Sequence, residues 1–207
     1  MKKKENYKTI GSFCETTLKE KSSVFNAHAY PIENEEDAIQ ILEKTKKKYY
    51  DATHHCYAYK LTGEKIKYSD AGEPSGTAGI RILNAINHFN LQNVLVIVIR
   101  YFGGTKLGAG PLGKAYYNSA VHTLEVSRII EKKAYKRIVI EADLNQMNNI
   151  YHSADEFNAK IIKSDYSNNV MFECLVSSEN AEQFVSNIIE LSKGEAKIVI
   201  DESIFFI

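Results

Sequence analysis

The 207-residue sequence predicts an α+β protein of two domains, 1–133 and 134–207. Strand-like and helix-like apolar periodicities alternate along the chain, which favours mixed sheets and helices. The second half follows the order βαββαβ, which is the ferredoxin-like split motif. The charge also changes sign, since residues 1–133 contain 20 Lys and Arg against 14 Asp and Glu, whereas the remainder contains 6 against 12. The boundary is expected near Lys132 and Lys133.

The elements of the first domain follow from local signals. Asn34 is a favourable N-cap for a helix whose lysine-rich last turn, residues 46–48, suits the negative end of the helix dipole. Val94–Ile99 is a continuous apolar run, typical of a strand covered on both faces. Pro111 is placed at the first position of a helix, where its missing N–H needs no partner. The other expected elements are strands at 8–18 and 22–30, a hairpin of 55–61 and 65–69 closed near Gly63, and a helix burying Ile82, Leu83, Ile86 and Phe89.

The second domain shows a simpler pattern of apolar residues. Residues 137–143 alternate like a half-buried strand, and apolar residues from Leu144 to Phe157 then share one helical stripe. Gly194 stops a second helix, which Asn180 begins. The remaining strands are expected at 161–163, 170–176 and 196–200. No catalytic constellation is evident in this half.

Glycines gather between Gly72 and Gly113, a segment that holds eight of the eleven glycines and two of the three prolines. They form two loops, Ser69–Gly79 and Arg100–Gly113, and each loop leads into a predicted helix. Glycine costs backbone entropy, so this density indicates unusual dihedrals or close backbone approach. We therefore expect the function in these loops.

The first loop has two interpretations. Backbone N–H groups around Ser75, Gly76 and Thr77 could bind an anion at the start of the next helix, with Ser75 or Thr77 as its cap. The carboxylates of Asp70 and Glu73 are close by, however, and would repel a phosphate. In the alternative interpretation, these carboxylates accept hydrogen bonds from the same N–H groups and act as internal caps.

The second loop is better equipped for binding an anionic partner. The basic residues Arg100, Lys106 and Lys114 are expected to contact phosphates, while Tyr101 and Phe102 offer faces for stacking. The loop also contains Gly103, Gly104 and Gly108, which permit close backbone approach. In the alternative, the two aromatic residues belong to the core and Arg100 braces the carbonyl groups of the loop. Neither a Walker spacing nor a dinucleotide fingerprint is present, so no cofactor is expected.

A third group of residues suggests different chemistry. Asp51, His54 and His55, together with Asp70 and Glu73 brought near by the hairpin, could supply acid, base or metal ligands. Adjacent histidines in a strand point to opposite faces, however, and rarely chelate one metal together. A histidine that a carboxylate orients to shape a loop is the more ordinary interpretation, and no metal is expected.

Composition limits the cellular setting. No run approaches the ~20 apolar residues of a membrane-spanning helix, and no apolar segment follows the positive N-terminus as a signal peptide requires. The three cysteines, Cys14, Cys56 and Cys174, are widely separated and odd in number. A reduced cytoplasmic protein without membrane partners is expected.

Three segments together closely resemble the IMPACT family in its bacterial, YigZ-like form. They are DATHHCYAY at 51–59, SDAGEPSGTAG at 69–79 and NVLVIVIRYFGGTKLGAG at 93–110. The match covers roughly residues 15 to 127, and the second half looks like the ferredoxin-like domain that bacterial members append. One departure is Pro111-Leu112-Gly113-Lys114, where bacterial members often have Gly-Leu-Val-Arg.

The resemblance implies an N-terminal α+β domain like a small-subunit ribosomal protein and domain IV of elongation factor G, with a C-terminal domain like its domain V. It also implies a link to translation, because eukaryotic relatives regulate a stress kinase of initiation by competing for its ribosome-associated activator. Fold likeness alone does not assign function. The family's motif residues carry no agreed catalytic role that transfers to this chain.

Three hypotheses for function follow. The first is a translation-associated regulatory protein whose basic loops bind RNA, the ribosome or a ribosome-associated protein. The second is a hydrolase of a small molecule or peptide, possibly metal-dependent, with its site between the two loops. The third is an interaction module whose glycines only permit tight packing.

Overall fold

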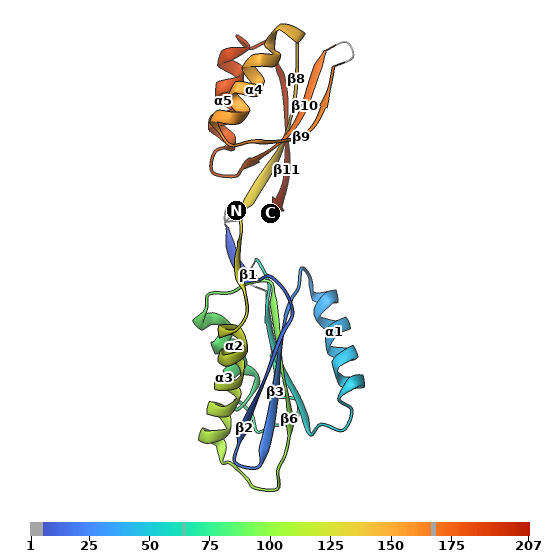
Figure 1. Ribbon diagram of the computed structural model, residues 1–207, viewed down its shortest axis with the longest axis vertical. Helices are drawn as coiled ribbons and strands as arrows, with labels where there is room; N and C mark the ends of the chain where they lie inside the picture. The colour runs from blue at the N-terminus through green and yellow to red at the C-terminus, as the bar shows by residue number, and fades with distance from the viewer. Residues whose placement is uncertain (1–5, 64, 167–168) are drawn as a thin grey trace. The chain divides into compact units, whose positions relative to one another are not determined.

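The computed structural model describes residues 6–63, 65–166 and 169–207, which form two compact units. One unit runs from Tyr7 to Glu131, and the other combines Asn6 with the chain from Lys132 to Ile207. Figure 1 follows the chain from blue to red through both units, and each is described by itself below. Both combine antiparallel sheets with helices, which confirms the predicted α+β class.

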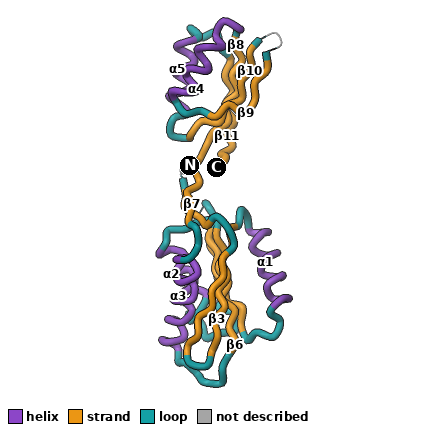
Figure 2. The backbone as a smooth tube through the Cα atoms, in the orientation of Figure 1, coloured by secondary structure: helices purple, strands orange, loops and turns teal. Residues whose placement is uncertain are grey.

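The N-terminal domain is built on a five-stranded antiparallel sheet of order β2-β3-β6-β4-β5. Helices cover both of its faces, with α2 and α3 on one and α1 on the other (Figures 1 and 2). Two further strands, β1 and β7, pair separately. The bounds are β1 Tyr7–Ile10, β2 Cys14–Glu20, β3 Ser23–Pro31, α1 Glu35–Lys48, β4 His54–Lys60, β5 Ile66–Ser69, α2 Gly79–His88, β6 Val94–Tyr101, α3 Ala109–Glu125 and β7 Ile129–Lys132.

The central strand of this sheet explains the apolar run in the sequence. Val94, Val96 and Val98 pack in the core beneath α2 and α3, whereas Leu95, Ile97 and Ile99 pack in the core beneath α1. All six side chains are fully buried. The prediction of a strand covered on both faces is therefore confirmed.

Helix α1 begins as predicted. The Asn34 side chain accepts a hydrogen bond from the Asp37 backbone N–H at 2.8 Å, and the Asp37 carboxylate accepts one from the Asn34 N–H at 3.3 Å. This reciprocal capping box satisfies donors that the helix itself cannot pair.

Some elements of the N-terminal domain differ from the prediction. The first expected strand is divided into β1 and β2 by a bend at Gly11 and Ser12. Helix α3 begins at Ala109, with Gly108 as its N-cap at φ +85°, so that Pro111 lies in the first turn rather than at the first position. A proline fits there because the first four N–H groups of a helix have no intrahelical acceptor.

The C-terminal domain is a four-stranded antiparallel sheet of order β11-β8-β10-β9, with α4 and α5 on one face (Figure 1). The bounds are β8 Ala134–Ala142, a 3₁₀ turn η1 Leu144–Gln146, α4 Met147–Glu156, β9 Lys160–Asp165, β10 Val170–Ser177, α5 Ala181–Leu191 and β11 Lys197–Phe206. This is the expected βαββαβ order. Its own core gathers around Phe172 and Phe184.

Candidate functional site

The register of the N-terminal sheet brings residues of the sequence motifs together. Arg100 on β6 lies opposite Phe25 on β3 and His54 on β4, so these three side chains share the face covered by α2 and α3. The first glycine-rich loop and Tyr116 of α3 close over this row. A polar cluster therefore lies inside an otherwise apolar core.

The Arg100 guanidinium is buried and held by protein groups. Its Nη1 donates to Glu73 Oε1 at 2.6 Å, and its Nη2 donates to Ser23 Oγ at 3.2 Å. Arg100 is 5% exposed and Glu73 is 8% exposed. A buried arginine keeps its charge, so the Glu73 carboxylate is the partner that makes its burial tolerable.

This geometry corrects the prediction that Arg100 contacts phosphates, because its donors face inward. Arg100 instead braces the first loop and β3 through the Glu73 carboxylate and the Ser23 hydroxyl, rather than through loop carbonyls as the alternative interpretation expected. Tyr116 adds a second hydrogen bond to Glu73 Oε1, at 2.7 Å from its hydroxyl oxygen. Glu73, Arg100 and Tyr116 thereby tie the first loop, β6 and α3 to one another.

His54 and Cys56 flank this cluster without forming a reactive pair. His54 Nδ1 lies 2.9 Å from the Ala71 carbonyl oxygen, and its Nε2 lies 3.8 Å from Glu73 Oε2. The Cys56 thiol donates to the Asp70 carbonyl oxygen at 2.9 Å. Burial raises the pKa of this thiol to about 12, so it carries no thiolate at neutral pH.

The first glycine-rich loop is internally satisfied. The Asp70 carboxylate accepts hydrogen bonds from the N–H groups of Gly76, Ala78 and Gly79, at 2.8 to 2.9 Å. Burial alone would raise the pKa of Asp70, but these three donors hold it below its usual value. Asp70 thus caps α2 from within the loop.

The anion interpretation of this loop is therefore wrong. The Gly76 N–H is occupied by Asp70, and the Thr77 hydroxyl and N–H both donate to the Pro74 carbonyl oxygen. Neither Ser75 nor Thr77 caps α2, whose N-cap is Ala78. Ser75 remains exposed at the surface.

The residues of the acid–base or metal hypothesis do not converge on one point. Asp51 accepts a hydrogen bond from the Tyr101 hydroxyl at 3.0 Å, and His55 Nε2 lies 2.9 Å from the Tyr49 carbonyl oxygen. Asp70 is used in capping, which leaves His54 beside Glu73. Within residues 6–63, 65–166 and 169–207, no three His, Cys, Asp or Glu side chains are placed to hold a metal ion.

The second glycine-rich loop joins two other loops at one end of the domain (Figure 2). Its Phe102 N–H donates to Thr53 Oγ1 at 3.0 Å, and the Thr53 N–H donates to the Arg100 carbonyl oxygen at 2.9 Å. Gly103 packs so closely on Ser22 that an added Cβ would lie 1.8 Å from the Ser22 carbonyl oxygen. We call residues 21–22, 50–53 and 102–106 the three-loop surface.

The predicted binding residues of this loop fall into two groups. The exposed group consists of Phe102, Gly103, Gly104, Lys106, Gly108 and Lys114. Of these, Gly103 also packs closely on Ser22 through its backbone. Tyr101 does not lie beside Phe102, because consecutive residues point to opposite faces. The Tyr101 ring packs on the α1 side and is partly buried, so of the two predicted stacking faces only that of Phe102 is exposed.

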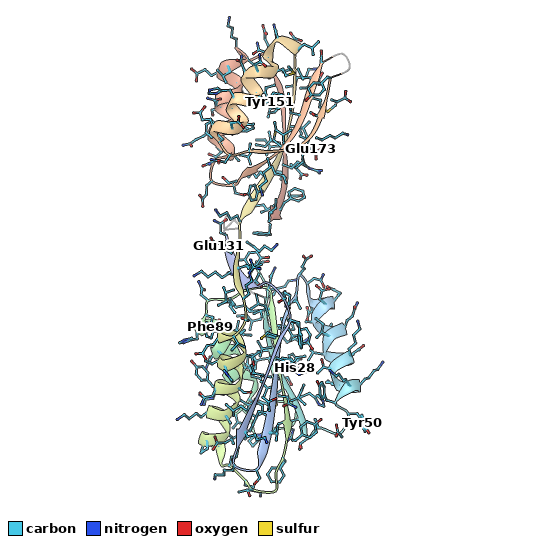
Figure 3. The ribbon with its side chains drawn as sticks, viewed as in Figure 1. His28, Tyr50, Phe89, Glu131, Tyr151 and Glu173 are labelled. Carbon is cyan, nitrogen blue, oxygen red and sulfur yellow. The ribbon has the colours of Figure 1, made fainter. Side chains whose placement is uncertain are left out.

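Tyr50 is an exposed aromatic residue that the sequence patterns did not single out. Tyr50, at the end of α1, is 84% exposed and projects into solvent in Figure 3. The signal in the sequence was its position after three lysines, in Lys46-Lys47-Lys48-Tyr49-Tyr50. Aromatic residues interleaved with basic ones are a feature of nucleic-acid surfaces.

The N-termini of α2 and α3, which follow the two glycine-rich loops, have differently charged side chains around them. Asp70 fills the start of α2, whereas α3 has no side-chain cap and no acidic residue in its first turn. Lys106 precedes the start of α3 and Lys114 lies just after its first turn. The N-terminus of α3 therefore combines helix-dipole charge with exposed lysines.

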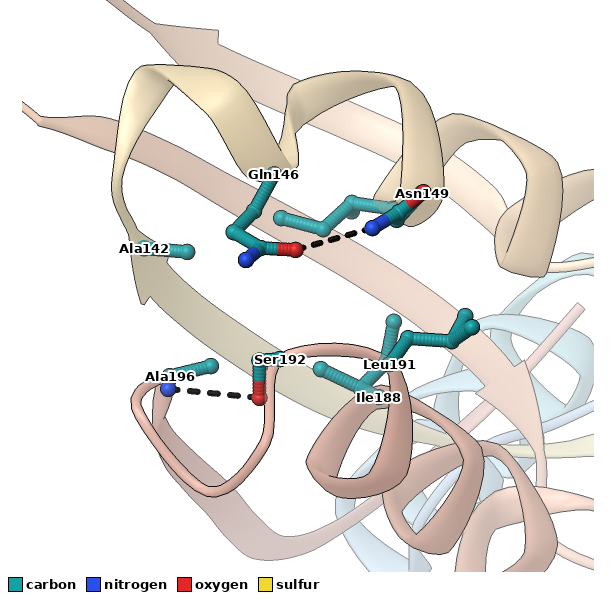
Figure 4. Close-up of a pocket in the computed structure, with 8 residues that line it drawn as sticks. Ala142, Gln146, Asn149, Ile188, Leu191, Ser192 and Ala196 are labelled. Atoms are coloured by element: carbon teal, nitrogen blue, oxygen red, sulfur yellow. Dashed lines mark hydrogen bonds between the residues drawn. The ribbon is translucent and has the colours of Figure 1, made fainter.

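The C-terminal domain offers no comparable site among its described residues. A crevice between α4 and α5 is lined by Ile150, Ile188, Leu191 and small or amide side chains. Within it, Asn149 donates to Gln146 and the Ala196 N–H donates to Ser192 (Figure 4). The crevice is too narrow to admit a water molecule. No helix in the described part of either domain has the length and apolar character to cross a membrane.

Comparison with known proteins gives a consistent result. The family model described as the Impact N-terminal domain matches residues 21–124. The chain is 33% identical over 196 residues to the IMPACT family member YvyE of Bacillus subtilis, covering 93% of this chain and 90% of YvyE. It is 28% identical to the IMPACT family member YigZ of Escherichia coli, covering 81% and 84% of the two chains.

A solved structure supports the fold across both domains. The crystal structure of a hypothetical protein aligns with 96% of this chain and 99% of its own length, at a TM-score of 0.67 and 25% identity.

Proposed function

Because this chain belongs to the IMPACT family, in its bacterial YigZ- and YvyE-like form, we propose that it is a translation-associated protein whose N-terminal domain binds ribosomal RNA. The observation that carries this proposal is the uncapped start of α3 between Lys106 and Lys114. Phosphate groups bind well where helix N–H groups and cationic side chains point at the same place.

The charge that supports the proposal is local rather than domain-wide. Within residues 7–131 the sequence contains 15 Lys and Arg against 13 Asp and Glu, an excess of only two. General attraction of the whole domain to RNA is therefore weak. The arrangement of lysines around α3 matters more, since Asp70 and Glu73 are turned inward to capping and to Arg100.

The resemblance to domain IV of elongation factor G suggests the ribosome as the setting. The proposal places the protein in the cytoplasm, with the acidic C-terminal domain orienting the first domain or meeting a protein partner in translation control. A hydrolase receives less support, because Asp51, His55 and Asp70 are each engaged elsewhere.

The test is sedimentation of the full chain with purified ribosomes at low and at raised salt. We expect comigration at low salt that weakens as salt rises, because phosphate contacts release counterions. The double variant Lys106→Glu with Lys114→Glu should remain at the top of the gradient. For each phosphate-contacting lysine replaced singly by alanine, the slope of log affinity against log salt should fall by about one.

A matched control changes the same charge elsewhere. Lys163→Glu with Lys193→Glu alters two exposed lysines of the C-terminal domain and should sediment like the unmodified chain. Equal loss in both double variants, or retained comigration in the Lys106 and Lys114 variant, would overturn the proposed function.

A further inference from the structure

Two exposed aromatic rings belong to the three-loop surface. Phe102 is 44% exposed and Tyr50 is 84% exposed. Their segments are tied together, because Thr53, three residues after Tyr50, accepts the Phe102 N–H and donates to the Arg100 carbonyl oxygen. The same three loops also carry two exposed lysines, Lys21 and Lys106.

The Phe102 ring is held in place from beneath. The Arg100 guanidinium carbon lies 5.4 Å from the Phe102 ring centroid and 5.3 Å from that of Phe25. Glu73 and Ser23 fix this guanidinium, and Ser23 Oγ also accepts the Gly103 N–H at 3.4 Å. The ring thus packs on the buried arginine, and the loop backbone is anchored to Ser23, which the same arginine contacts.

We propose that the three-loop surface binds unpaired nucleotides of RNA, with bases stacked on Phe102 and Tyr50 and phosphates on Lys21 and Lys106; this inference rests on the proposed function. A fixed aromatic ring can stack on the face of a base only when that face is free. In a duplex both faces are covered by neighbouring pairs. The surface therefore selects loops, bulges or single strands over helical RNA.

Arg100 is a positioning residue in this arrangement. It does not reach the ligand, since its Nη1 and Nη2 donate to Glu73 and Ser23 and its Nε is buried, but it sets the ring on which a base would stack. Stacking on a ring face tolerates any base, so binding should show little sequence preference.

The experiment measures binding of the full chain to a fluorescent ten-nucleotide oligouridylate and to a ten-base-pair RNA duplex, by anisotropy at one low salt concentration. We expect the single strand to bind at least tenfold more tightly. Tyr50→Ala and Phe102→Leu should each weaken single-strand binding by about fivefold to a hundredfold, and Phe102→Tyr should retain it.

Two controls separate stacking from folding. Tyr68→Ala removes an aromatic residue that is 49% exposed on β5, away from the three-loop surface, and should bind normally. Tyr50 is almost fully in solvent, so its replacement leaves the fold intact, and the melting temperature of the Phe102→Leu variant checks the second position.

Equal affinity for duplex and single strand, no binding of oligouridylate, or normal binding by both Tyr50→Ala and Phe102→Leu would overturn this inference. The ribosome sedimentation test is independent of these outcomes. Salt-sensitive comigration lost on reversing Lys106 and Lys114, together with aromatic variants that bind normally, would retain the proposed function and reject base stacking.

Discussion

Two carboxylates of the first glycine-rich loop, three residues apart, have different structural roles. Asp70 accepts three backbone N–H groups at the start of α2, whereas Glu73 accepts from Arg100 and Tyr116 inside the core. Asp70 thus shapes the loop, and Glu73 fastens it to the sheet and to α3. The N–H groups that Asp70 occupies are not presented to a ligand.

The capping role of Asp70 predicts a pH-dependent loss of stability in Asp70→Ala. The pKa of Asp70 is lowered in the folded state, so its ionised form adds stability above the unfolded value of about 3.9. This contribution is lost as pH falls through the folded pKa. We expect the variant to be less stable by about 2 kcal/mol at pH 7, with the difference shrinking below about pH 4.

Urea unfolding at several pH values measures this difference. Ser75→Ala, at an exposed position of the same loop, should unfold like the unmodified chain throughout. A constant gap between the Asp70→Ala and unmodified chains from pH 7 to pH 3 would contradict ionic capping.

At the scale of elements, two glycines of the second glycine-rich loop have different surroundings: Gly103 lies in close contact with another turn, and Gly110 lies at the start of α3 with free space around it. Gly103 lies against the Ser22 backbone of the β2–β3 turn, so this position excludes any Cβ. A Cβ added at Gly110, in the first turn of α3, would meet no neighbouring atom within 4 Å. Packing therefore requires glycine at the first of these positions and leaves room for a side chain at the second.

This difference predicts opposite effects of the same substitution. Gly103→Ala should lower the free energy of unfolding by about 1–3 kcal/mol, because the Ser22 turn must move to make room. Gly110→Ala should raise it by about 0.4–1 kcal/mol, because alanine restricts the unfolded chain and suits a helix. Urea titration measures both, and a neutral Gly103→Ala would show that the three loops are not in tight contact.

At the scale of the whole molecule, the chain holds separate cores. Phe25, Tyr116 and Ile82 belong to a core of the N-terminal domain, while Phe172 and Phe184 belong to that of the C-terminal domain. Since each domain has its own apolar interior, unfolding of the chain need not be a single two-state transition.

Phe172→Ala tests this independence. The side chain is completely buried, and its removal should destabilise the C-terminal domain by about 3–5 kcal/mol. Amide hydrogen exchange should then lose protection across β8 and β10 and keep it in β3 and β6. A similar loss of protection in both domains would mean that they unfold as one cooperative unit.

Local patterns in the sequence were sufficient to predict the fold class, the βαββαβ order of the second half, the capped start of α1 and the doubly covered strand β6. These features depend on local signals: apolar period, turn residues and a capping box spanning four residues. The family resemblance likewise rests on contiguous motifs, which comparison with YvyE and the Impact N-terminal domain confirms.

Which polar residues face solvent depends on how the strands and loops pack together. Arg100 and Lys106 look alike in sequence as basic residues of one loop, but strand pairing turns Arg100 toward Phe25, His54 and Glu73. Tyr50 and Phe102 lie far apart in the sequence, and the pairing of their segments depends on hydrogen bonds between the end of β6 and the residues before β4. Burial and long-range pairing are properties of the assembled sheet, so no local pattern could assign them.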